Sequence, residues 1–156
     1  MLDSNVQPHT VADWRERFIR RDLPLAYLMV RATMGFHMIA HGGSRLPILR
    51  AFAAETRGEF AGVTLIGLPL FPAWLVTMIA YMIPPTEFVI GLLLSVGLKT
   101  RLACTVGNVL FLVMMFGTVA RMEFGTGHVM WWYVMIFALL GGLSFNDRYS
   151  VDQMWK

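Results

Sequence analysis

Residues 71–98 read FPAWLVTMIAYMIPPTEFVIGLLLSVGL and contain a single charged side chain, Glu87. A helix needs about 20 predominantly apolar residues to cross a bilayer, so this stretch predicts a transmembrane helix. A carboxylate at that depth is expensive unless it is protonated or paired, which makes Glu87 a candidate functional residue. Pro84 and Pro85 precede it, and each lacks a backbone N–H and crowds the preceding turn. A helix break beside an acid predicts a pocket, because freed carbonyls must be received by protein or a polar cavity.

The rest of the chain has the same apolar character. Of its 156 residues, 56% are hydrophobic and only 15% are charged, whereas soluble domains carry about 25% charged residues. Four apolar blocks are long enough to span a bilayer, at residues 23–43, 72–98, 102–120 and 129–145. The last three spans are joined by short links, which makes them antiparallel neighbours. The sequence therefore predicts an all-α membrane protein, a four-transmembrane-helix antiparallel bundle within residues 23–146.

The N-terminal segment, residues 1–22, is polar and charged, so we expect no cleavable signal peptide before the first span. Apolar residues recur there at spacings of three and four, opposite a face of arginines: Val11, Trp14 and Phe18. This pattern predicts an N-terminal amphipathic helix that lies in the membrane interface. Thr10 and Asp13 have the spacing of a capping box at its start.

Residues 44–71 form an outer loop, because they are neither long enough nor apolar enough throughout to cross the membrane. Residues 47–57 predict a short helix with its charged side chains in solvent. The following residues, 62–72, are apolar but interrupted by glycine and proline, which disfavour a regular helix. We expect this part to lie on the outer membrane face or dip into it. Residues 147–156 form a polar tail.

Lysine and arginine are distributed unevenly between the two sides of the predicted bundle. One side has eight of them: Arg15, Arg17, Arg20, Arg21, Lys99, Arg101, Arg148 and Lys156. The other side has four: Arg45, Arg50, Arg57 and Arg121. Because positive charge favours the cytoplasmic side, both termini are expected in the cytoplasm. The net charge of +3 reflects this asymmetry and gives no reason to expect a nucleic-acid partner.

Arg31 lies inside the first span, on one helical face with Gly35 and Gly42. Small residues at this spacing let a second helix approach closely. Two interpretations of Arg31 remain open. Its side chain reaches the cytoplasmic headgroups, or it has a partner inside the bundle, for which Glu87 is the candidate.

His37 and His41 are one turn apart in the first span, a spacing that lets two imidazoles bind one metal ion. Two ligands do not make a site, and a third would have to come from Glu87 or His128. Hydrogen-bonded histidines near a polar interface are the simpler interpretation, so no metal is expected. Glu87 also has two interpretations. It is a protonated acid that hydrogen-bonds a neighbouring helix, or a group that handles protons or contacts a ligand.

The remaining soft or aromatic side chains predict ordinary roles. Cys104 is the only cysteine, so it cannot form an internal disulfide or a redox dithiol, and we expect it to pack in the interior. The 12 methionines are scattered through the spans, which is typical of flexible packing rather than copper binding. Trp131, Trp132 and Tyr133 begin the fourth span, where an aromatic belt belongs. Stacking of one of them on a quinone ring is the alternative.

Three stretches resemble the DoxX/DoxD family of membrane proteins. Residues 30–46, VRATMGFHMIAHGGSRL, look like its opening signature, an Arg followed by Gly and then a His-Gly pair. Residues 87–101, EFVIGLLLSVGLKTR, are similar to its E-x3-G-x5-G-x2-T-R run, and residues 147–152, DRYSVD, to its R-Y-S-x-D ending. The matching positions are Arg31, Gly35, His41, Gly42, Glu87, Gly91, Gly97, Thr100, Arg101, Arg148, Tyr149, Ser150 and Asp152.

The resemblance implies a four-helix protein of the prokaryotic cytoplasmic (inner) membrane. Some members, the DoxD type, are a subunit of thiosulfate:quinone oxidoreductase, and others are associated with oxidative-stress or thiol-related complexes. The resemblance therefore implies a quinone-linked redox subunit. In it, Glu87 would exchange a proton with a quinone that approaches His37 and His41, and Arg31 would orient or balance the carboxylate.

Two other classes of function remain open. The first is a non-catalytic accessory subunit of a larger respiratory or photosynthetic membrane complex, in which Arg31 and Glu87 fix helix packing. A small-molecule channel or transporter is supported less well, because four helices without an inverted repeat do not resemble one. In every case the expected partners are the lipid bilayer and either other membrane subunits or further copies of this chain.

Overall fold

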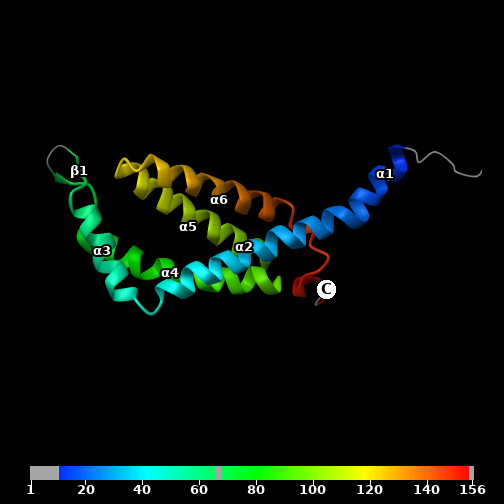
Figure 1. Ribbon diagram of the computed structural model, residues 1–156, viewed down its shortest axis with the longest axis horizontal. Helices are drawn as coiled ribbons and strands as arrows, with labels where there is room; N and C mark the ends of the chain where they lie inside the picture. Colours follow the sequence, from blue (N-terminus) through cyan, green and yellow to red (C-terminus); the bar gives the residue numbers. More distant parts are fainter. Residues whose placement is uncertain (1–10, 66–67, 155–156) are drawn as a thin grey trace, which may run out of the picture.

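The computed structural model describes residues 11–65 and 68–154, and almost all of them are helical (Figure 1). The helices are α1 (Val11–Arg17), η1 (Phe18–Asp22), α2 (Leu23–Arg45), α3 (Leu49–Ala61), α4 (Ala73–Val96), α5 (Thr100–Ala120), α6 (Phe124–Gly142), η2 (Ser144–Asn146) and α7 (Val151–Met154). Two short strands, β1 (Thr64–Leu65) and β2 (Leu68–Pro69), pair antiparallel. The prediction of an all-α protein is confirmed.

Four helical segments in the described part of the chain are long and apolar enough to cross a membrane. They are Trp14–Arg45, Ala73–Val96, Thr100–Ala120 and Phe124–Gly142. Large apolar side chains such as Phe36 and Leu139 are exposed along them, which suits a lipid surrounding. These helices match the four predicted spans and indicate a multi-pass membrane protein.

The N-terminal segment continues into the first span without a break. α1, the π-helical η1 and α2 follow one another directly, and Figure 1 shows them as one long helix that extends beyond the others. The boundary predicted at residue 22 is therefore not a helix end. Thr10 and the side chain of Asp13 lie outside the described residues, so the capping box stays a prediction.

The predicted helix break at Pro84 and Pro85 is wrong, because α4 runs through both prolines. Each proline removes one backbone N–H donor, but the flanking residues keep theirs. Unwinding the helix in lipid would leave more backbone groups without hydrogen bonds than the two that the prolines remove. Pro84 is also buried, with its carbonyl oxygen against α2 at Gly42. Packing from α2 therefore holds the helix together where local propensity opposes it.

Glycines bring α2 and α4 into close contact. A Cβ placed on Gly42 would lie 2.5 Å from the Phe88 backbone nitrogen, and one on Gly35 would lie 2.8 Å from that of Ser95. On the α4 side, a Cβ on Gly91 would lie 2.6 Å from the Ile39 nitrogen. The predicted close approach at the glycine stripe is confirmed, and it fixes which residues of the two helices face each other.

α5 and α6 form the second closely packed pair (Figure 1). Phe137 of α6 fills the space that Gly107 of α5 leaves, and both Phe137 and Phe111 belong to the buried core. Cys104 is a free, buried residue of the same core, which confirms its packing role.

The outer loop is more ordered than the sequence suggests. The predicted short helix is α3, which packs against α4 and buries Ala53. Residues predicted to be irregular contain the β1–β2 pair, with Thr64 opposite Pro69 and Leu65 opposite Leu68. The pattern analysis missed it because two-residue strands are too short to show an alternating pattern.

Candidate functional site

Glu87 lies on the buried face of α4 and is only 1% exposed. Arg45, the last residue of α2, donates from Nη1 to Oε2 at 3.1 Å and to Oε1 at 3.3 Å. Moving a carboxylate out of water is costly, and a guanidinium within hydrogen-bond distance offsets part of that cost. The Arg45 side chain is 27% exposed and lies over the Phe52 ring at 5.2 Å. The ion pair therefore connects a buried acid to the protein surface.

Two histidines and a tyrosine extend this polar site along α2. The rings of His37 and His41 have centroids 4.4 Å apart. Tyr133 of α6 places its Oη 2.7 Å from His37 Nε2, within hydrogen-bond distance, and its ring stacks on Phe111 at 4.6 Å. Side chains from three helices thus hold the imidazoles in place.

All these groups line one small cavity of about 30 Å³. Its walls come from α2, α4, α5 and α6: His37, Met38, His41, Arg45, Glu87, Phe111, Met114, Met130 and Tyr133. A cavity needs about 10–15 Å³ for each water, so this one has room for about two, beside several hydrogen-bonding groups. The structure brings Glu87, His37 and His41 to one cavity.

A quinone ring does not fit this cavity. Sites that bind organic ligands typically have volumes of about 300–1,000 Å³, ten or more times the volume found beside Glu87. Water and protons are therefore the species that these residues accommodate in the arrangement seen here.

Arg31 is buried at the other end of α2 and does not pair with Glu87. It is 1% exposed, so it does not reach the headgroups. Its Nη1 donates to the Leu94 carbonyl at 3.0 Å and its Nη2 to the Tyr149 carbonyl at 3.1 Å, while Nε lies 3.6 Å from Asp147 Oδ1. The glycine contacts place Arg45, about 21 Å farther along α2, beside Glu87 instead.

The tail after α6 folds back onto this arginine. Asp147 is 3% exposed and accepts a hydrogen bond from Thr100 Oγ1 at 3.2 Å. Ser150 Oγ donates to the Asp147 carbonyl at 3.1 Å. Burial raises the pKa of Asp147, and the Arg31 guanidinium and these hydrogen bonds act in the opposite direction. Arg31 therefore balances a carboxylate, but of Asp147 rather than Glu87.

Asp152 joins the tail to the turn between α4 and α5. Its Oδ1 accepts from the Lys99 amide at 2.7 Å, and its Oδ2 accepts from the Thr100 amide at 2.9 Å. Gly97 in this turn has a φ of 73°, and a Cβ there would overlap Arg31 Nη1. Arg31, the turn after α4 and the tail after α6 thus meet at one end of α2.

Three residues of the Glu87 cavity and of the contacts around Arg31 were missed or misassigned by sequence reasoning. Asp147 stands in the quoted C-terminal stretch, but nothing in the pattern indicates that the tail folds back to Arg31. Arg45 is predicted on the outer side, and Tyr133 in an aromatic belt. Their positions at span ends were the one available signal, because long side chains there can reach inward as well as outward.

Metal coordination is not supported by the geometry. Within the described residues, no group of three His, Cys, Asp or Glu side chains lies close enough together to hold an ion. His128, the suggested third ligand, makes an edge contact with Trp132 at 6.3 Å rather than joining His37 and His41.

No family model matches this chain, and searches of curated proteins and of solved structures likewise return no significant match.

Proposed function

We propose that this chain is a membrane subunit of a redox system, of the DoxX/DoxD type, and that the cluster around Glu87 handles its protons. The proposal includes an antiparallel four-helix bundle in the prokaryotic inner membrane, with both termini cytoplasmic and the N-terminal helix at the interface. The observation that carries it is a buried carboxylate, two imidazoles and a phenol around a cavity of water size.

The arrangement supports proton exchange between the surface and the cavity. Arg45 donates to both carboxyl oxygens of Glu87, and its partly exposed side chain connects the pair to the protein surface. A proton taken up at Glu87 removes the charge that holds Arg45. In the same cavity, the imidazoles of His41 and His37 and the Tyr133 hydroxyl can each give and accept a proton.

Quinone enters this proposal only through the family resemblance. Because the cavity is too small for its ring, we assign it no position between these helices. The chain's own contribution is the delivery or removal of protons, and the redox group would be supplied by a partner subunit or reached at the lipid-facing surface.

A second candidate is a purely structural accessory subunit. It is favoured by the ion pairing of both buried acids, Glu87 with Arg45 and Asp147 with Arg31. On this reading Glu87 ties α4 to α2 and never changes its protonation state.

Infrared spectroscopy of the purified protein during a pH titration distinguishes the two. The proton-handling site predicts a protonated carboxyl band that appears and disappears reversibly as the pH is lowered and raised, and that is absent from Glu87→Gln. Glu59→Gln is the matched control, because Glu59 also pairs with an arginine, Arg121, but is 40% exposed. A Glu87 carboxylate that stays ionised at every pH where the protein is folded would refute proton handling.

A further inference from the structure

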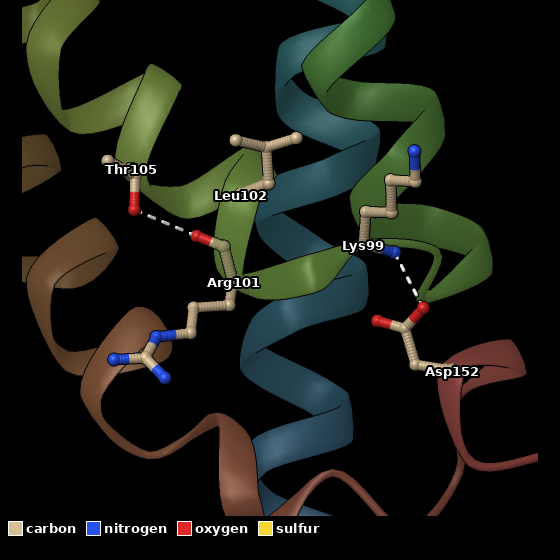
Figure 2. A pocket seen from close by; sticks show the side chains of 5 residues that line it. All are labelled: Lys99, Arg101, Leu102, Thr105 and Asp152. Atoms are coloured by element: carbon tan, nitrogen blue, oxygen red, sulfur yellow. Dashed lines mark hydrogen bonds between the residues drawn. The ribbon is translucent and has the colours of Figure 1, made fainter. Parts of the chain in front are cut away.

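The turn between α4 and α5 carries two basic side chains beside an open hollow of about 430 Å³. Lys99, Arg101 and Asp152 line it, together with Leu102 and Thr105. Figure 2 shows the Lys99 side chain extending along α4, whereas the Arg101 side chain points away from it, toward the end of α6. The two cations thus stand on opposite sides of the first turn of α5.

Among the described residues that line the hollow, Asp152 is the one acid, and it is already hydrogen-bonded. Both carboxylate oxygens of Asp152 accept backbone N–H groups, from Lys99 and from Thr100. Among the described residues, neither the Lys99 ammonium nor the Arg101 guanidinium has an ion-pair partner. The hollow therefore holds two cations that no described side chain pairs and one carboxylate, an excess of one positive charge that favours an anion.

Two apolar grooves begin at this hollow and run along opposite sides of α5. The groove between α4 and α5 has about 300 Å³, shares Leu102 with the hollow and continues to Thr86 and Val106. The groove between α5 and α6 has about 320 Å³, shares Arg101 and Thr105 with it and continues to Leu112. At 1.5 Å per helical residue the second groove extends about 16 Å, roughly the depth of one leaflet of the hydrocarbon core.

We propose that this site binds a diacyl phospholipid with an anionic headgroup. The phosphate lies in the hollow at the first turn of α5, where the flexible Lys99 and Arg101 side chains can each turn toward it, and one acyl chain follows each groove, so that the lipid straddles the start of α5. Basic pockets between membrane helices favour anionic headgroups over zwitterionic ones. The pairing of one charged hollow with two apolar grooves matches one headgroup with two chains.

Lipid binding to the purified protein is measured by native mass spectrometry, with dioleoyl phosphatidylglycerol titrated against dioleoyl phosphatidylcholine. One phosphatidylglycerol should bind in preference. Removing both charges with Lys99→Gln/Arg101→Gln should lower its affinity by about fivefold for each cation. The control, Arg50→Gln/Arg57→Gln on exposed positions of α3, removes the same charge elsewhere and should leave binding unchanged.

The grooves are tested without altering the cations. Gly142→Phe fills the α5–α6 groove, where a new Cβ meets nothing within 4 Å, and Val89→Trp fills the α4–α5 groove. Each should weaken phosphatidylglycerol binding, whereas Gly125→Phe, at the opposite end of α6 and equally open, should not.

Equal binding of the two lipids, or an unchanged affinity in Lys99→Gln/Arg101→Gln, would overturn the site. An effect of the charge variants alone, with no effect of the groove variants, would overturn the two-chain arrangement and leave only headgroup attraction. Size-exclusion chromatography confirms that every variant is folded. None of these outcomes depends on proton handling at Glu87.

Discussion

Glu87 and Arg45 form one ion pair, but the two charges differ in how well they would be solvated without it. Glu87 is 1% exposed, so when the arginine is absent its carboxylate has only the small cavity, and no bulk water, to solvate it. The Arg45 side chain is 27% exposed and keeps a route to solvent when the acid is absent. The two partners should therefore differ in what their removal costs.

Arg45→Gln should lower the free energy of unfolding more than Glu87→Gln, by roughly 1–3 kcal/mol, because a buried acceptor left unsatisfied pays its full desolvation cost. Proton binding by Glu87 limits the loss, so the deficit should shrink at low pH. Thermal unfolding in detergent, followed across pH, measures both effects. Equal destabilisation by the two variants would show that Glu87 reaches water by another route.

Single residues show how far sequence reasoning reaches at this scale. Hydrophobicity alone identified Glu87, Arg31 and the two histidines as exceptional, because each is a polar group in an apolar span. Hydrophobicity does not indicate which of these polar residues contact one another. Which residue meets which depends on the register of α2 against α4, and that register is set by glycine contacts between distant parts of the chain.

At the scale of helices, the contact between α2 and α4 is the element on which the site depends. Gly42 lies against the Pro84 carbonyl, three residues or nearly one helical turn before Glu87, so a change in helix separation there moves Arg45 relative to the carboxylate. The adjacent Gly43 only faces the Phe88 ring, with 3.6 Å available to a Cβ. The two neighbours provide a matched comparison.

Gly42→Ala should destabilise the fold by roughly 1–3 kcal/mol, because its Cβ would lie 2.5 Å from the Phe88 backbone nitrogen and force the helices apart. Gly43→Ala should be neutral or stabilising by up to about 1 kcal/mol, since alanine favours the helix and has room. Thermal unfolding of the two variants side by side measures the difference. A neutral Gly42→Ala would mean that the two helices separate at little cost.

The helices themselves were predictable from the sequence, and the exceptions have physical reasons. Span positions follow from apolar length, which is why the last three spans were predicted within about five residues of their observed ends, whereas the helix of the first span begins earlier, at Trp14. The break predicted at Pro84 and Pro85 is wrong because it rests on local propensity alone, and proline opposes a helix. Packing against α2 and the lipid surrounding both favour the helix. The β1–β2 pair could not be predicted from the sequence, since strands of two residues have no alternating pattern.

At the scale of the whole molecule, polar contacts divide between the two ends of the helices. Arg31, Asp147, Thr100 and Asp152 join the tail to α2 and α5 at one end, whereas Arg45 and Glu87 lie toward the other. The tail's position could not be read from its own sequence, because its contacts lie on helices far earlier in the chain. The lipid site proposed beside Lys99 and Arg101 shares the tail's end of the molecule.

The distribution of basic residues predicts which end faces the cytoplasm, and the chain suits a direct test. Cys104 is 1% exposed, so the native protein should react little with thiol reagents and serve as its own blank. In intact cells, a membrane-impermeant maleimide should label Arg57→Cys but not Arg17→Cys, and both should react after lysis, because positive charge keeps the N-terminal side inside. Labelling of Arg17→Cys alone in intact cells would reverse the orientation. It would also move the proposed lipid site to the outer leaflet, where a preference for anionic headgroups has less physical basis.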